Sequence, residues 1–175
     1  MSLLATVFRT RTSRIAAVAL VLVVCDQFTK ALVLRFLPAV WDEHEVLPGF
    51  FKFVHWQNTG ASWSLFAGNN KVLAVVAVVA LVVLFLGRHQ FDSRSLLGQF
   101  SLGLIFGGIT GNLIDRVHVG HVIDFLRFYV RQSSGNELGF PAFNLADSAI
   151  CTGVGLIFLI SLRADRHNQS AEIPN

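Results

Sequence analysis

The sequence has few charged residues. Only 14% of its 175 residues are Asp, Glu, Lys or Arg, whereas 53% are hydrophobic, and an ordinary soluble domain is roughly 25% charged. So few charges could not cover the surface of a soluble fold of this length, which makes the lipid bilayer the expected solvent. The net charge of +3 is small and the Lys and Arg residues are dispersed, which argues against a nucleic-acid partner.

Cysteine is also scarce. Cys25 and Cys151 both fall inside apolar segments, so a structural disulfide is not expected, and neither has the spacing of a metal ligand. There is no internal repeat and no low-complexity tract. We therefore interpret residues 1–175 as a single integral membrane domain.

Long apolar runs are abundant. Four of them can cross about 30 Å of hydrocarbon as helices, at about 1.5 Å per residue, and they cover about 15–37, 70–87, 96–114 and 140–162. Helix is the expected form because an isolated strand leaves its backbone unpaired in lipid. The first run, with its basic start, resembles a signal peptide. It continues past Asp26 to Leu37, however, which is too long for one, so we expect a permanent span.

The basic residues near the span ends predict the orientation. They precede the first span, separate the second from the third and follow the fourth, which places both termini in the cytoplasm. Residues 38–71 and 115–139 then lie outside. The segment Phe50–Gln57 is rich in aromatic and β-branched residues and predicts a strand. Two interpretations of this strand fit the composition: an interfacial hairpin that only anchors the chain, or a small sheet that cradles a substrate. The fold class is an all-α membrane protein with four transmembrane helices, a small extracytoplasmic β-cradle and a short outer amphipathic segment.

Two aspartates lie in apolar surroundings. Asp124 follows Val122-Ile123, and Asp147 lies seven residues into the fourth predicted span, about two helical turns or roughly 10 Å below the outer surface. An ionised carboxylate there is costly unless it finds a partner, takes a proton or faces a wet cavity. Both residues lie on the same predicted side of the membrane. We therefore predict a pair that shares one proton and activates a water.

Other polar residues recur at helical spacing. Asp26 and Lys30 share a face as an ion pair, or reach the aspartates and fix their geometry. Gly103, Gly107 and Gly111 form a face that admits a neighbouring helix.

The end of the third span is polar as well. Asn112 and Arg116 also share a face. Either Asp115 and Arg116 form an interfacial ion pair that ends the span, or Arg116 and Asn112 orient a nearby carboxylate or backbone carbonyl. His118 and His121 have no convincing third ligand, so no metal site is expected.

Together these segments resemble a known family. Five motifs occur in order around four spans: Asp26-Gln27-x-x-Lys30, Asn58-x-Gly60-Ala61, Gly111-Asn112-x-x-Asp115-Arg116, Val122-x-Asp124-Phe125 and Phe143-Asn144-x-Ala146-Asp147-Ser148. Their order and the topology closely resemble bacterial lipoprotein signal peptidase, or signal peptidase II, over most of the chain. One departure is Ser62-Trp63 after Gly60-Ala61, where the family more often has Ala then Phe, which leaves the fine lipobox preference open.

The resemblance implies a function. An aspartic endopeptidase of the bacterial inner membrane would cleave prolipoproteins immediately before the diacylglyceryl-modified lipobox cysteine, with its active site towards the outer leaflet. By motif position Asp124 and Asp147 would be catalytic. Asn58, Gly60, Asn112, Arg116 and Asn144 would position the substrate and the pair, and Asp26, Lys30 and Asp115 would support them. We expect no cofactor, a phospholipid environment and a monomer.

Three other classes of protein are alternatives. A small proton-coupled carrier would use the pair as a relay, but it predicts polar residues through the whole depth of the bundle, and here they cluster in the outer half. A two-metal head-group transferase needs closely spaced aspartates. A non-catalytic scaffold would tolerate loss of both aspartates.

Overall fold

Four helices and a small sheet make up the structure, a computed structural model that describes residues 10–60, 68–91, 95–132 and 135–171, with side chains to 163. The helices are α2 (Arg11–Phe36), α3 (Asn70–Gly87), α4 (Leu96–His118) and α5 (Leu145–Ala171). All four contain an apolar stretch long enough to cross a membrane. The prediction of four long apolar helices is confirmed. Ser62 and Trp63, where the sequence departs from the family pattern, lie outside the described residues, and so does Ala61.

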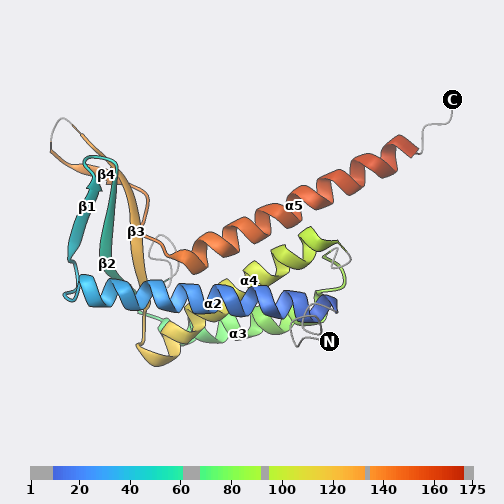
Figure 1. The fold of residues 1–175 in the computed structure, drawn as a ribbon, viewed down its shortest axis with the longest axis horizontal. Coiled ribbons are helices and arrows are strands. Elements are labelled where there is room, and N and C mark those ends of the chain that lie inside the picture. The colour runs from blue at the N-terminus through green and yellow to red at the C-terminus, as the bar shows by residue number, and fades with distance from the viewer. Residues whose placement is uncertain (1–9, 61–67, 92–94, 133–134, 172–175) are drawn as a thin grey trace, which may run out of the picture.

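The small sheet that the sequence predicts is present, so the description all-α fits only the helical part. Strands β1 (Glu43–Leu47), β2 (Phe51–Asn58), β3 (Val122–Arg131) and β4 (Glu137–Gly139) form an antiparallel sheet in that order. It extends from one end of the helices (Figure 1). The strand expected at 50–57 is β2. No helix occurs among the described residues between α2 and α3 or between α4 and α5, so the expected outer amphipathic segment is not seen there.

The fourth helix begins later than predicted. Phe140–Asn144 is extended, because Pro141 disfavours helix before it and Phe143 pairs with Leu126 of β3. The amides of Phe125 and Leu126 both donate to the carbonyl of Phe143, at 3.0 and 2.8 Å. Asp147 therefore lies in the first turn of α5, and the expectation that it lies two turns into a helix is wrong.

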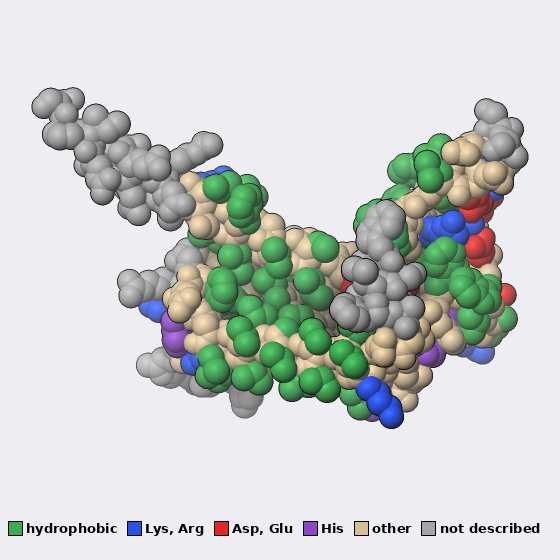
Figure 2. Space-filling view, turned by 180° about the vertical axis from the view of Figure 1, so that it is seen from behind, with side chains coloured by type: hydrophobic (Ala, Val, Ile, Leu, Met, Phe, Trp, Pro, Cys, Tyr) green, Lys and Arg blue, Asp and Glu red, His purple; other side chains and the backbone are tan. Residues whose placement is uncertain are grey.

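Helix α4 lies at the centre and contacts the other three helices. Its glycines allow the close approach that the sequence predicts. A Cβ on Gly103 would lie 2.5 Å from Val18 of α2, and one on Gly108 would lie 2.5 Å from the carbonyl of Ala146 in α5. Helix α3 contributes no buried residue. Figure 2 shows hydrophobic side chains over the helical surface, as expected for a surface in lipid.

On the face that Figure 2 shows, most of the acidic side chains lie on the sheet, together with Lys and Arg. The ammonium of Lys52 on β2 lies 2.5 Å from Glu43 of β1 and 2.8 Å from Glu137 of β4. Arg131 lies 2.5 Å from Glu45. These ion pairs tie the strands together across one face. The phenyl rings of Phe51, Phe53 and Phe128 pack against one another elsewhere on the sheet.

Candidate active site

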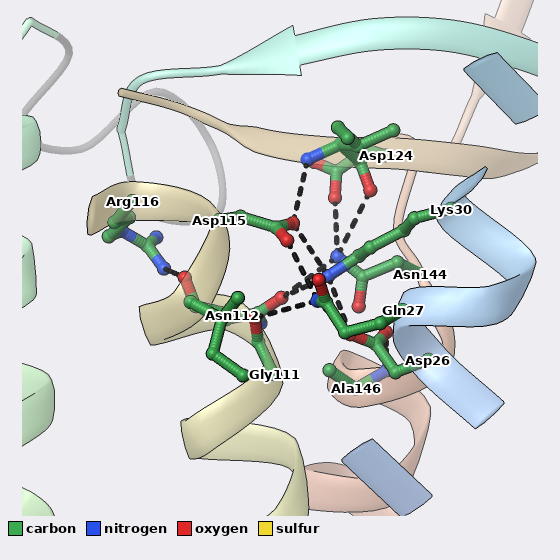
Figure 3. Close-up of polar contacts among 12 residues, drawn as sticks. Asp26, Gln27, Lys30, Gly111, Asn112, Asp115, Arg116, Asp124, Asn144 and Ala146 are labelled. Atoms are coloured by element: carbon green, nitrogen blue, oxygen red, sulfur yellow. Dashed lines mark hydrogen bonds and ion pairs between the residues drawn. The ribbon is translucent and has the colours of Figure 1, made fainter. Parts of the chain in front are cut away.

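A buried lysine joins α2 to α4 (Figure 3). The ammonium of Lys30 lies 2.8 Å from Asp26, 2.7 Å from Asp115 and 3.2 Å from the side-chain oxygen of Asn112. An ammonium has three N–H donors, and these three acceptors match that number. The Asp26–Lys30 ion pair is thus present, and it also reaches towards the aspartates through Asn112. Asp115 pairs with Lys30, so its interpretation as the ion-pair partner of Arg116 is wrong.

Asn144 is the N-cap of α5. Its side-chain oxygen accepts a hydrogen bond from the backbone amide of Asp147 at 2.9 Å. Its backbone amide in turn donates to the carboxylate of Asp147 at 3.2 Å. This reciprocal pair satisfies two amides that a helix start leaves free, which is the logic of a capping box. Asp147 is therefore oriented by the same contacts that begin its helix.

Asp124 lies on β3 and is almost completely buried. One carboxylate oxygen accepts from the side chain of Asn58 and the other from Asn144, both at 2.9 Å. Burial, and next the negative charge of Asp147, raise the pKa of Asp124 to about 7, against the lowering effect of these hydrogen bonds. Asp124 therefore carries a proton in a large fraction of molecules at neutral pH.

The amide of Asn112 connects the lysine to the aspartates. Its oxygen accepts from Lys30 and, at 3.1 Å, from Asn144, so its nitrogen must point the other way. That nitrogen donates to Asp147 at 2.7 Å. Lys30 thus fixes which way the Asn112 amide faces, and Asn112 in turn fixes one carboxylate oxygen of Asp147.

Arg116 and Gly60 lie beside the pair. The guanidinium of Arg116 donates to the carbonyls of Gly60, at 3.2 Å, and of Asn112, at 3.3 Å. The amide of Gly60 donates to the side-chain oxygen of Asn58 at 2.9 Å, so the chain turns directly after β2. Asn58, Gly60 and Arg116 therefore hold one another next to Asp124.

Both aspartates line one cavity of about 700 Å³. Its other lining residues include Asn58, Gly60, Asn112, Arg116 and Ser148. Asp26, Lys30 and Asp115 lie behind this cavity, and Asn144 connects its two carboxylates. The predicted site residues thus come together from α2, β2, α4, β3 and α5. Among the described residues, no group of three or more His, Cys, Asp or Glu could hold a metal ion.

The sequence reading missed three contributors. Gln27 donates to Asp115 at 2.9 Å and to Asp26 at 3.2 Å, and Asn70 of α3 donates to the carbonyl of Arg116 at 2.9 Å. The amide of Ala146 donates to Asp26 at 3.0 Å. Gln27 could have been predicted, because it is a polar residue next to Asp26 in an apolar span. The contact of Ala146 could not, because it is made by the backbone and does not depend on the side chain.

Four apolar helices, together with two carboxylates that line one cavity, are the features of a multi-pass membrane enzyme. The chain belongs to the family described as signal peptidase (SPase) II, whose sequence model matches residues 18–163. It is accordingly a peptidase of the bacterial membrane.

Individual relatives and solved structures agree. The chain is 40% identical to the lipoprotein signal peptidase of Symbiobacterium thermophilum over 148 residues, which are 85% of this chain and 93% of that protein. It is 32% identical to that of Staphylococcus aureus over 161 residues, 89% and 92% of the two chains. A bacterial membrane enzyme solved by the in meso method at 1.9 Å is similar, with a TM-score of 0.69 and 32% identity, over 83% of this chain and 90% of that one. A second, at 2.3 Å, gives a TM-score of 0.68 at 32% identity, over 91% and 93%.

Proposed function

We propose that this chain cleaves the signal peptides of prolipoproteins with Asp124 and Asp147 as its catalytic pair. The relatives are named lipoprotein signal peptidases, and the cut would fall immediately before the diacylglyceryl-modified cysteine. The single observation that supports this best is that both carboxylates line one cavity and are held by one residue, Asn144. Two carboxylates in a poorly hydrated site suit one shared proton and an attacking water.

The proposed reaction needs no covalent intermediate. Asp147, ionised, takes a proton from a water as that water attacks the scissile carbonyl, and Asp124 donates its proton to the carbonyl oxygen. In the second step Asp147 passes its proton to the departing nitrogen as the C–N bond breaks. Asp124 recovers a proton from the hydroxyl that becomes the new carboxyl group. The pair then returns to its starting state with one proton.

The surrounding residues position the reactants. Asn144 and Asn112 hold the two carboxylates, and Lys30 with Asp26 and Asp115 fixes the amide of Asn112. Asn58 keeps a hydrogen bond on Asp124. Arg116, whose Nε is buried without a hydrogen-bond partner among the described residues, and Gly60 would contact the substrate backbone. Removing any of these should slow cleavage less than removing a catalytic aspartate.

The orientation is part of the proposal. Both termini would lie in the cytoplasm, and the sheet and the cavity would face the outer leaflet of the inner membrane. This agrees with the basic residues near the span ends and with the position of the sheet at one end of the helices (Figure 1). The acyl chains of the substrate would then stay among phospholipids while the lipobox backbone reaches Asp124 and Asp147. A monomer contains all of these residues.

The test compares purified wild-type protein with Asp124→Asn and Asp147→Asn on a diacylglyceryl prolipoprotein in detergent. Each substitution keeps the size of the side chain but cannot accept or hold the proton, so cleavage should fall by at least about a thousandfold. Glu45→Gln, on the sheet away from the cavity, should cleave at a rate near that of wild type. Complete processing by either aspartate variant would disprove the assignment.

A chelator separates this mechanism from that of a two-metal enzyme. Prolonged incubation with EDTA should leave the cleavage rate unchanged, since protons rather than a Lewis acid do the work here. Loss of activity that added Mg²⁺ or Zn²⁺ restores would contradict the proposed aspartic mechanism.

A further inference from the structure

One wall of the active-site cavity consists of side chains that the proposed reaction does not use. Trp41, Trp56 and Arg127 line the cavity together with Asp124. The rings of Trp41 and Trp56 lie 5.6 Å apart, and the guanidinium of Arg127 lies 4.4 Å from the ring of Trp56. These three residues, the Trp-Arg wall, come from the turn before β1, from β2 and from β3.

Trp41 is held in a conformation that a bulky residue rarely adopts. Its φ is 75°, in the left-handed region. Its amide donates to the carbonyl of His55 at 2.9 Å, and the amide of His55 donates to the carbonyl of Asp42 at 2.9 Å, so β2 fixes the turn. The residue nevertheless remains 66% exposed. A strained backbone that presents an exposed aromatic ring beside a cavity indicates binding rather than packing.

Arg127 has donors without close acceptors. Its side chain is only 16% exposed, yet its ion pairs with Glu43 and Glu137 measure 3.8 and 3.6 Å, longer than a hydrogen bond. Among the residues that the structure describes, its Nε has no hydrogen-bond partner, and neither has Nε1 of Trp56. A largely buried guanidinium with five N–H donors favours a ligand that supplies acceptor oxygens.

The charge around Arg127 identifies the kind of acceptor. The ion-pair network contains three acidic and three basic side chains, Glu43, Glu45 and Glu137 against Lys52, Arg127 and Arg131. No net positive charge remains to attract an anion. A neutral acceptor, such as a peptide carbonyl, suits this environment better than a phosphate or a carboxylate.

The position of the wall identifies the part of the substrate. Its residues belong to the sheet and its turn, outside the four spanning helices. In the proposed orientation the apolar signal peptide and the acyl chains would stay in the membrane, away from this wall. Arg127 follows Asp124 by three residues on β3, roughly 10 Å along an extended strand. We propose that the Trp-Arg wall binds the mature side of the substrate, with Arg127 donating to a backbone carbonyl a few residues after the lipidated cysteine. This inference rests on the proposed function.

The test compares two substrates. One is a lipopeptide that ends, as an amide, at the diacylglyceryl cysteine, and the other continues for six further residues. Arg127→Gln should raise KM for the long substrate by about tenfold, the effect of one hydrogen bond to a charged group. It should leave kcat, and KM for the short substrate, unchanged, because only uniform binding is lost. Trp41→Ala should act in the same direction.

The control is Arg131→Gln, which removes a guanidinium of the same network that does not line the cavity. It should behave as wild type on both substrates, and thermal unfolding in detergent should show that each variant is folded. An equal loss on both substrates, or no effect on either, would overturn the proposal. If wild type cleaves neither substrate, the proposed function fails as well, and the two failures are thus distinguishable.

Discussion

Asn144 has three tasks at the scale of single residues. It begins α5, orients Asp147 through two hydrogen bonds, and donates to Asp124. An aspartate at this position could still accept from the amide of Asp147, since Asp is a good N-cap. It could not donate to Asp124 when ionised and would add a third carboxylate beside the cavity. The site therefore requires the side-chain amide of Asn144, and another capping side chain would not be enough.

The pH dependence of stability should report on Asp124. The folded state holds a proton on this group up to about pH 7, whereas an unfolded chain loses it near the ordinary aspartate pKa of 3.8. Its contribution is fully present below the unfolded pKa and is lost as pH rises through the folded pKa. The gap between the pKa values of 3.8 and about 7 corresponds to roughly 4 kcal/mol.

Asp124→Asn removes this titration. The melting temperature of the variant in detergent, relative to that of wild type, should rise between pH 4 and pH 8. The comparison is of slopes, because the new amide also disturbs the contact with Asn58. A constant difference across this range would show that Asp124 is not protonated in the folded protein.

The candidate site residues were predictable from sequence because charge in an apolar run is a strong signal. Asp124, Asp147, Asp26 and Lys30 all stand out in this way. Trp56 and Arg127 did not, because an aromatic or basic residue in an outer segment is ordinary there. Their significance depends on the stack that the fold creates.

At the scale of secondary-structure elements, small residues set the distances between helices. A Cβ on Gly111 would lie 2.5 Å from a carboxylate oxygen of Asp26, so α4 can approach the Asp26–Lys30 pair only through a glycine. The glycine repeat every four residues predicted this face. The carboxylate that the face accommodates could not be predicted from the repeat.

Gly111→Ala should therefore separate α2 from α4 and disturb the contacts of Lys30. We expect a loss of about 1–3 kcal/mol in stability, typical of overpacking, together with slower cleavage. Gly155→Ala is the matched control, because nothing lies within 4 Å of a Cβ there and the residue is also helical. It should leave cleavage unchanged and stabilise α5 slightly. Melting curves and cleavage rates of both variants test this prediction. Equal stability and equal cleavage rates for the two variants would contradict it.

The element boundaries were less predictable than the elements. The apolar run from Phe140 favoured a helix start there, but a strand contact between Phe143 and Leu126 takes the first five residues. Pairing between segments 17 residues apart leaves no periodic trace in so short a run. The helix start at Leu145 follows only once Asn144 is recognised as its cap.

At the scale of the whole molecule, the spans give the chain two distinct sides. Val46 of β1, 44% exposed, and His89, exposed between α3 and α4, should lie on opposite sides of the membrane. In a background with Cys25→Ser and Cys151→Ser, Val46→Cys should react with a membrane-impermeant maleimide in intact spheroplasts. His89→Cys should react only after permeabilisation. The opposite pattern would reverse the proposed orientation.

The central position of α4 explains why α3 contributes so little to the site. Helix α3 has no buried residue, and its contact with the site is the hydrogen bond from Asn70 to the carbonyl of Arg116. Its apolar composition predicted a span but not this peripheral place. That place depends on which helices carry the glycine faces.

The cap of α5 also affects when the protein becomes a protease during its synthesis. Asp124 is made before α5, but its partner arrives only with the last helix, and both are joined through the residue that starts that helix. Under the proposed mechanism, a chain that still lacks α5 has only one of the two catalytic carboxylates and should not hydrolyse a peptide bond. We expect activity to appear in one step, when the fourth helix has inserted, so that immature copies are harmless to the membrane in which they fold.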